Sequence, residues 1–354
     1  MVKIARFGAI ALRTMVLSAA LILLHGLPLS GDDAKTVSLS DVAQKAASQS
    51  TLIDTGSTPF HIKFTVADPL NPDSDYSATI EEFWVSSQRW RRTIDSPDFP
   101  QITIVNGGKV SEQNTGDYFP LWLRDIVTAV LTPLPMIAGM EDWKAEVPAL
   151  SGDASRISCS RLTSKSGLSA VPVELTFSFC FEGSRGLVDS VTTPQFTAQF
   201  KNYTTFKNKF IAREIWETRD PGLKIRAIVT ELSELSSLDE GLSTVQPIGD
   251  AAAVQLQSID VTEASLRGLS VAIPDILWPN VSGGNTSGTI AAYVCVDTSG
   301  YVREAWIVSS DNSELNDVLR KQIMKWQFKP GIVNGSRVQL ESLLAFPFKT
   351  KLIK

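Results

Sequence analysis

Most of the chain alternates short apolar runs with turn-forming residues. Between residues 36 and 238, runs rich in Thr, Val, Ile, Phe and Trp recur at intervals of about 8–12 residues. This spacing is typical of antiparallel strands, and it predicts a β-rich domain over residues 32–238. Clear examples are FHIKFTVADP at 60–69, ATIEEFWVS at 78–86 and FIAREIWETRD at 210–220.

Two segments of this region follow helical spacing instead. Residues 36–50 place Val42 and Ala46 on one stripe, with Ser40 as the expected N-cap. The segment LWLRDIVTAVLTP at 121–133 predicts a second helix, which ends at its proline. The economical architecture is one extended antiparallel sheet that carries two capping helices.

The C-terminal region, residues 265–354, has a shorter and clearer order of elements. The segments GTIAAYVCVD (288–297) and YVREAWIVSS (301–310) predict two strands joined by a tight turn. A helix and a last strand at 337–352 follow, so the order is β-β-α-β. We therefore expect an α+β protein in which a connector over residues 239–264 joins this small domain to the β-rich domain.

The helix predicted in this region, ELNDVLRKQIMKW, has an apolar face that its last residue, Trp326, completes. Phe328 follows, Pro330 stops the element, and Asn334-Gly335 forms a turn before the last strand. Two aromatics between lysines could also form a nucleic-acid or membrane-surface patch. The helical spacing favours packing of both rings in the core, with the lysine side chains extending outward.

An ordered set of residues runs through the same region. The set is Trp278-Pro279, Gly288, Val294, Val296-Asp297, Gly300, Val302, Ser309-Ser310, Trp326, Phe328, Pro330, Gly335 and Val338. In this order it resembles the pattern of the C-terminal domain of the TonB family, over about residues 265–350.

This resemblance implies a module that binds a partner and is associated with transmembrane transport. Domains of that family add a short segment of an outer-membrane transporter to the edge of their sheet. The expected edge is the last strand, and its expected partner-binding residues are Arg337, Gln339, Glu341, Leu343 and Lys349. The basic residues there suit an acidic partner or, alternatively, protect an open strand edge from aggregation.

Two features depart from the TonB pattern. Residues 32–264 hold a folded region where that family has a Pro-rich spacer. Ser18 and His25 are seven residues apart, whereas the family's membrane anchor carries Ser and His one helical turn apart. These departures argue against energy coupling to an inner-membrane proton gradient, but not against the interaction module.

A second motif lies in the β-rich region. The residues E-x-W-V-S-x-x-x-W-R-R, from Glu82 to Arg92, are similar to LolA-like periplasmic half-barrels, which hold lipid acyl chains against a curved sheet. This resemblance implies a half-barrel over residues 36–238 and, as the alternative function, a periplasmic carrier of lipid or lipoprotein. A plainer interpretation is that Trp84 and Trp90 are core or strand-pair aromatics.

Composition and the N-terminus place the protein in the cell envelope. A hydrophobic content of 43% and a charged content of 20% are typical of globular chains. Three basic residues precede an apolar run at Met15–Leu24, which is too short to be a permanent membrane span. We expect a signal peptide over residues 1–31 and a periplasmic mature protein. The alternative is an uncleaved inner-membrane anchor over residues 9–29.

The cysteines bear on the same question. Cys159 and Cys180 lie in two strand-like segments separated by a turn-rich stretch, so they could face each other in a hairpin. Either they form a disulfide, as an oxidising compartment allows, or they are two buried thiols. Cys295 is left over and is expected to be buried and inert.

No pattern of catalytic residues supports an enzyme. Apart from the expected signal peptide, His61 is the only histidine, and it alternates with apolar strand residues. The sequence has no metalloprotease, redox, serine-hydrolase or phosphate-loop motif, so we expect no enzyme activity, no cofactor and no metal site. Nucleic-acid binding is excluded by export and by acidity, because residues 32–264 carry 31 acids and 20 bases. Residues 265–354, with 7 acids and 10 bases, are mildly basic.

Overall fold

The computed structural model describes residues 37–71, 74–114, 117–134, 146–147, 157–166, 173–183, 185–236 and 256–353. The expected signal peptide or anchor and most of the expected connector lie outside these residues. Contacts group residues 36–354 into one compact unit. Among the described helices, none combines the length and apolar character that a membrane span requires.

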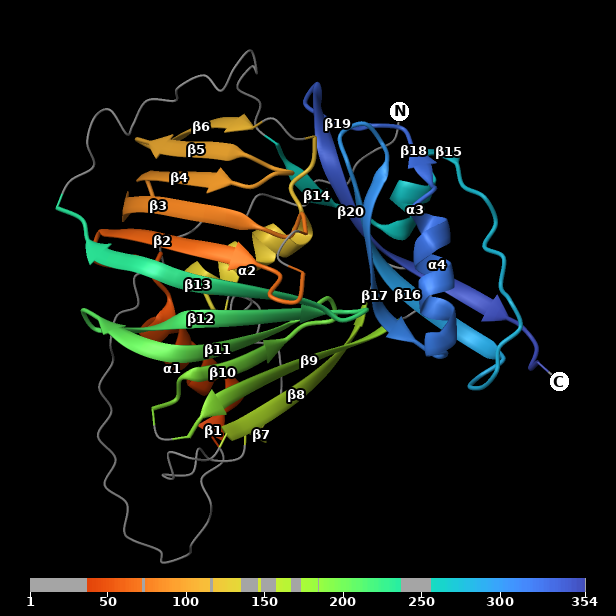
Figure 1. Cartoon of the computed structure of the whole chain (residues 1–354), viewed down its shortest axis with the longest axis horizontal. Coiled ribbons are helices and arrows are strands. Elements are labelled where there is room, and N and C mark those ends of the chain that lie inside the picture. The colour runs from red at the N-terminus through yellow and green to blue at the C-terminus, as the bar shows by residue number, and fades with distance from the viewer. Residues whose placement is uncertain are drawn as a thin grey trace, which may run out of the picture. The chain divides into compact units, whose positions relative to one another are not determined.

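An eleven-stranded antiparallel sheet forms the N-terminal region, as the spacing of apolar runs predicts (Figure 1). Its strand order is β6-β5-β4-β3-β2-β13-β12-β11-β10-β9-β8. The strands are β2 (Phe60–Ala67), β3 (Ala78–Ser86), β4 (Arg89–Asp95), β5 (Gln101–Asn106), β6 (Lys109–Asn114), β8 (Ile157–Ser166), β9 (Val173–Glu182), β10 (Val188–Thr192), β11 (Thr197–Phe206), β12 (Lys209–Arg219) and β13 (Leu223–Glu234). A separate short pair joins β1 (Val37–Ser38) to β7 (Glu146–Val147).

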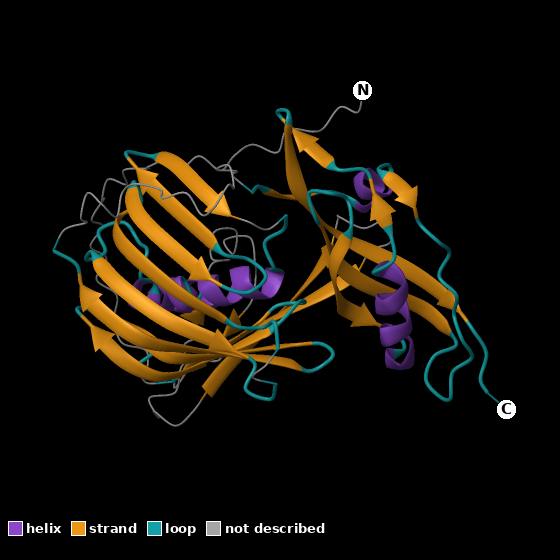
Figure 2. Cartoon of the chain, turned by 45° about the horizontal axis from the view of Figure 1, so that its top comes forward, coloured by secondary structure: helices purple, strands orange, loops and turns teal. Residues whose placement is uncertain are grey.

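One face of this sheet is apolar and is covered by two helices, α1 (Leu39–Ser50) and α2 (Leu121–Leu131). In β2 the side chains alternate, with Phe60 and Ile62 buried and His61 half-buried on the other face. Figure 2 shows the strands curving around the helices. The large core therefore lies between the concave face of the sheet and α1 and α2.

The helices agree with the sequence pattern in place but not in every detail. Val42 and Ala46 of α1 are buried, as their spacing predicts. Ser40 was expected as the N-cap, but α1 begins at Leu39, so Ser40 lies inside the first turn. Its hydroxyl accepts a hydrogen bond from the Gln44 amide at 3.2 Å, one turn later on the same helix.

The C-terminal region contains the expected β-β-α-β order with several short additions. A five-stranded sheet has the path β14-β20-β16-β17, with β19 paired to β20, and β15 and β18 form a separate pair. The elements are β14 (Ser258–Asp260), α3 (Glu263–Arg267), β15 (Ser270–Ala272), β16 (Ser287–Val296), β17 (Val302–Ser310), the 3-10 helix η4 (Ser313–Leu315), α4 (Asn316–Ile323), β18 (Gln327–Phe328), β19 (Gly331–Val333) and β20 (Ser336–Lys349).

The turn between β16 and β17 explains two residues of the sequence pattern. The Asp297 carboxylate accepts the backbone N–H groups of Ser299 and Tyr301 at 2.8 and 2.9 Å. Gly300 has a φ of +94°, and a Cβ at this position would collide with the carbonyl oxygen of Phe328. Its own carbonyl oxygen accepts the Phe328 N–H at 2.8 Å. A side chain at residue 300 would therefore separate this turn from β18.

Trp326 and Phe328 are buried, as the helical spacing predicts, but the expected helix end is wrong, because α4 ends at Ile323, before Trp326 and Pro330. Trp326 is 2% exposed and Phe328 is 1% exposed. The Trp326 ring lies 5.5 Å from the Phe346 ring and 6.3 Å from the Phe328 ring, measured between centroids. Lys325 and Lys329 are exposed. The basic aromatic stretch is thus a packing element and not a stacking patch.

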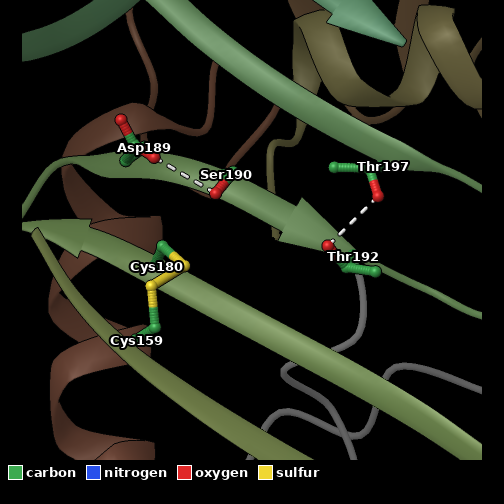
Figure 3. The surroundings of a disulfide bond; sticks show 6 residues. All are labelled: Cys159, Cys180, Asp189, Ser190, Thr192 and Thr197. Carbon is green, nitrogen blue, oxygen red and sulfur yellow. Dashed lines mark hydrogen bonds between the residues drawn. A yellow bond between two sulfur atoms is a disulfide. The ribbon is translucent and has the colours of Figure 1, made fainter. Parts of the chain in front are cut away.

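Of the two alternatives for Cys159 and Cys180, a disulfide or two buried thiols, the structure shows the disulfide, which joins β8 to β9 (Figure 3). The two residues are direct partners in the antiparallel register. Cys180 alternates with the buried Phe179, so the disulfide lies on the face of the sheet opposite the large core. Cys295 is a buried free thiol, and burial raises its pKa well above the usual value.

Candidate functional site

A mainly apolar concavity lies between α2 and strands β9, β10 and β11. It has a volume of about 190 Å³. Its apolar lining consists of Leu121, Ala129, Pro133, Leu134, Phe179, Val191, Phe196, Ala198 and Phe200. Its polar lining consists of Arg124, Asp125, Thr128, Thr193, Gln195 and Tyr293, the last of which comes from β16.

One face of α2 forms the roof of this cavity. The lining residues Leu121, Arg124, Asp125, Thr128 and Ala129 follow helical steps of three and four, so they share a face. The remaining surface of the helix is mostly apolar and packs into the large core. Because most of the α2 surface is apolar and packs into the core, only the face that carries Arg124 and Asp125 remains directed at the cavity.

The sheet forms the floor. Val191 of β10 is the register partner of Phe179 in β9 and of Ala198 in β11, so all three side chains point to the same face. Phe200 lies two residues beyond Ala198 and shares that face. A row of three neighbouring strands therefore contributes one continuous apolar surface, and a small residue, Ala198, leaves room above it.

A bidentate ion pair lies at one end of the cavity. Arg124 donates from its two terminal nitrogens to the two Glu341 oxygens, at 2.5 and 2.8 Å. The Tyr293 hydroxyl lies 2.8 Å from Glu341 and 2.7 Å from the Asp260 carboxylate. Burial alone would raise the pKa of Glu341, but the Arg124 guanidinium and the hydroxyls of Ser258 and Tyr293 outweigh it and hold this pKa below its usual value.

A second charged group lies deeper under α2. Arg219 is fully buried and donates to Glu217 and to Asp125, each at 2.5 Å. Its guanidinium also lies over the rings of Phe196 and Trp306, at 5.0 and 5.1 Å. Burial raises the pKa of Glu217 to about 7, although the Arg219 charge acts in the opposite direction. Arg219 therefore ties β12 to α2 beside the cavity wall.

Glu304 of β17 meets the first turn of α2. Its carboxyl oxygens accept the Leu121 N–H at 2.7 Å and the Trp306 indole N–H at 2.6 Å. The first N–H groups of a helix have no partner within the helix, and a carboxylate also suits the positive end of its dipole. Burial nevertheless raises the pKa of Glu304 to about 7. Together, Glu304 and Glu341 hold the polar end of α2 against the C-terminal sheet.

The residues expected to bind a partner at the last strand have different environments. Arg337 and Lys349 are exposed, whereas Gln339, Glu341 and Leu343 are buried. Gln339 accepts the Phe119 N–H at 2.7 Å and donates to the Phe119 carbonyl at 3.2 Å. Leu343 belongs to a small apolar cluster with Ala291 and Ala345. The buried three thus face the α2 side of the molecule rather than solvent.

The expectation that β20 is an edge strand is wrong for its first part. Residues 336–338 pair with β19, residues 339–341 pair with β14, and the other side of the strand pairs with β16 from residue 340 onward. Short strands without a periodic pattern supply the extra pairing. The backbone of residues 336–341 is therefore already hydrogen-bonded to neighbours within the chain.

The other residues of the C-terminal pattern are structural. Trp278 packs on Phe348, and the Pro279 carbonyl accepts a hydrogen bond from Thr350. A Cβ at Gly288 would collide with the side chain of Asp311. Pro330 lies between β18 and β19, and Gly335 has a φ of +83° in the turn before β20. None of these residues lines the cavity.

The motif from Glu82 to Arg92 also lies away from the cavity. Trp84 is buried and stacks on Phe60, with ring centroids 5.5 Å apart. Glu82 is buried and forms an ion pair with Arg92 at 2.6 Å. This packing supports the plainer interpretation of Trp84. The cavity residues of α2 and of β9–β11 were not singled out by the sequence, although Arg124-Asp125 inside an apolar helix is a signal that could have identified them.

Comparisons with known proteins give distant similarity. No family model matches the chain, and no curated protein matches it. Among solved structures, a LolA superfamily protein from Nitrosomonas europaea has 10% identity and a TM-score of 0.35, covering 59% of this chain and 98% of its own. A domain of a proposed outer-membrane lipoprotein-sorting protein from Vibrio parahaemolyticus has 10% identity and a TM-score of 0.27, covering 57% and 94%. These values assign no family, and they give no support to the expected TonB-type domain.

Proposed function

We propose that the protein binds the hydrocarbon chain of a lipid-like molecule under α2 and acts as a carrier in the cell envelope. The observation that carries this proposal is the cavity of about 190 Å³ with its mainly apolar lining. An apolar cavity of about 150 Å³ is large enough to hold a benzene-sized ligand. The space under α2 therefore suits a segment of an alkyl chain.

The composition of the lining supports an apolar ligand. Nine of the fifteen lining residues are apolar, and their side chains forgo contacts wherever no other molecule supplies them. Each buried CH₂ group would return about 0.8 kcal/mol. A hydrocarbon chain is the class of ligand that gains most from this lining.

The disulfide supports placing this activity outside the cytoplasm. Cys159 and Cys180 are bonded, and such bonds persist in oxidising compartments such as the periplasm. A soluble carrier is needed there because an aqueous space separates two membranes. We do not extend the proposal to strand addition at β20, because the backbone of residues 336–341 already pairs with β19 or β14, and residues 340 and 341 pair with β16 as well.

The test is a series of alkyl alcohols measured by displacement of an apolar fluorescent probe. We expect affinity to rise about fourfold for each added CH₂ group, between about six and about ten carbons, because each group is buried in the cavity. Native mass spectrometry of protein purified from an envelope fraction should also detect bound alkyl chains. Affinity that does not depend on chain length would exclude this function.

A further inference from the structure

The charged residues of the cavity lie toward the start of α2. After Leu121, the lining passes through Arg124, Asp125 and Thr128, and it is apolar from Ala129 to Leu134. Tyr293 joins the polar end through the Arg124–Glu341 pair. A ligand in this cavity thus has a defined direction, with its hydrocarbon chain toward Leu134.

The sheet side shows the same gradient. Thr193, Gln195 and Phe196 form the connection between β10 and β11, and they line the cavity beyond Val191. Phe196 lies beside Arg219, which is bonded to Asp125 of α2. The β10–β11 connection and the start of α2 are therefore at the same end, where a ligand's head group would lie.

The guanidinium groups at this end are already committed to carboxylates. Arg124 is the only basic residue in the described lining, and both of its terminal nitrogens donate to Glu341. Arg219 donates to Glu217 and Asp125 through two of its nitrogens. Its third nitrogen, Nη1, has no hydrogen-bond partner among the described residues, but the side chain is fully buried and does not line the cavity. Carboxyl groups outnumber guanidinium groups here, because Arg124 and Arg219 face Asp125, Glu217, Glu304 and Glu341. A carboxylate head group would find no free cation and several like charges.

A neutral hydrogen-bonding group is available at the same end. The Gln195 side chain is half-buried, lines the cavity and makes no hydrogen bond to a described residue. Its amide can both donate and accept. By contrast, the Thr193 hydroxyl oxygen already accepts the N–H groups of Gln195 and Phe196. Gln195 can therefore bond to a hydroxyl or ester head group without displacing an existing partner.

We infer that the cavity selects a single hydrocarbon chain with an uncharged head group, as in a long-chain alcohol or a monoacylglycerol, and discriminates against a fatty acid carboxylate. This inference rests on the proposed function, because it presumes that an alkyl chain occupies the cavity. The discriminating element is the Arg124–Glu341 pair, which removes the one lining cation from use by a ligand.

The first arm of the test compares decanol, monodecanoylglycerol and decanoate on the wild-type protein at about pH 8, where the carboxylate is ionised. We expect the two neutral ligands to bind at least about tenfold tighter than decanoate. Decanoate that binds equally or more tightly would overturn the inference and leave the proposed function intact, whereas binding of none of the three would overturn both.

The second arm tests whether the preference for the alcohol comes from the charged network or from the low solubility of long-chain alcohols in water. Glu341→Gln frees the Arg124 guanidinium and should reduce the preference for decanol over decanoate by about tenfold. The matched control is Glu234→Gln, which breaks the exposed Lys207–Glu234 pair and should leave the preference unchanged. An unchanged preference in a folded Glu341→Gln protein would overturn the inference. If that variant does not fold, the wild-type comparison decides, and decanoate that binds as tightly as decanol and monodecanoylglycerol would overturn the inference.

Discussion

Two apolar interiors of this molecule are built from similar residues but packed differently. In the C-terminal region, Trp326, Phe328 and Phe346 meet ring against ring between α4 and the sheet. Under α2, the small side chains of Ala129 and Ala198 stand where large ones would fill the space. The first interior is closed by its own side chains, whereas the second retains a cavity of about 190 Å³.

This difference separates a structural core from a candidate binding site. A well-packed interior stabilises the fold through contacts that the chain supplies itself. A cavity lined by apolar groups forgoes those contacts unless another molecule supplies them. Substitutions in the two interiors should therefore differ in kind: those near Trp326 change stability alone, and those near Ala129 change ligand binding more than stability.

The largest effect is expected in the filled interior. Trp326→Ala should lower the free energy of unfolding by about 3–5 kcal/mol, because it removes buried surface and leaves a void between α4 and β20. Urea unfolding measures this change. The exposed neighbour Lys325 provides the control, since Lys325→Ala should change stability by no more than about 0.5 kcal/mol. Equal effects of the two substitutions would show that Trp326 is not a core residue.

A smaller effect is expected from the ion pair that joins the two regions. Glu341→Gln should lower the free energy of unfolding by about 2 kcal/mol, because it leaves the Arg124 guanidinium without its bidentate partner. The value is below that of a fully buried pair, since Arg124 is 33% exposed. Glu234→Gln at the exposed Lys207 pair should cost about 0.5 kcal/mol or less. A loss no larger than in this control would contradict the role of Glu341 in holding α2.

The stability of the contact between α2 and the C-terminal sheet should depend on pH through Glu304. Burial raises the pKa of Glu304 from 4.5 to about 7 in the folded protein. Between these pH values the folded protein binds more protons than the unfolded chain, so the stability contributed by Glu304 is full at low pH and is lost as the pH rises through 7. Asp125 raises this pKa further, and Arg219 lowers it.

The measurement compares wild type with Glu304→Gln, which cannot titrate, at about pH 5 and about pH 8. We expect the wild type to lose about 1–3 kcal/mol more stability than the variant over this interval. The variant should also be less stable at both pH values, because the Leu121 and Trp306 N–H groups bond to two different carboxyl oxygens, one of which Gln replaces with an NH₂ group. Equal losses of stability in the wild type and the variant between these two pH values would contradict the raised pKa of Glu304.

Much of the fold was accessible from the sequence because burial follows strand and helix periodicity. Phe60 and Ile62 alternate with polar residues, and the spacing of Leu319 and Ile323 defines the buried face of α4. The environment of β20 was not accessible. Its partner β14 has only the residues Ser258–Asp260, and such a short strand leaves no periodic signal. Gln339 and Glu341 consequently resembled exposed positions of an edge strand, although they are buried against α2.

The candidate site was harder to predict than the fold. Ala129 and Ala198 are ordinary apolar residues in a helix and a strand, and whether they meet a neighbour or an empty space depends on how α2 lies over β9–β11. The local signal was the charged pair Arg124-Asp125 within an otherwise apolar helix. Its partners Glu341 and Arg219 are distant in sequence, so only the folded chain reveals that both charges are satisfied.

The substitution with the smallest expected effect on stability tests the ligand site most directly. Ala129→Leu should fill part of the cavity and change the free energy of unfolding by less than about 1 kcal/mol, because the added methyl groups enter empty space. The matched control is Ala46→Leu on α1, where Ala46 is fully buried in the same core but does not line the cavity. That substitution should cost about 1–3 kcal/mol through overpacking.

Binding of decanol to these two variants is the decisive measurement. If an alkyl chain occupies the space under α2, Ala129→Leu will lower the affinity for decanol at least about tenfold, and Ala46→Leu will leave it near the wild-type value. Undiminished decanol binding by a folded Ala129→Leu protein would contradict the assignment of this cavity as the ligand site.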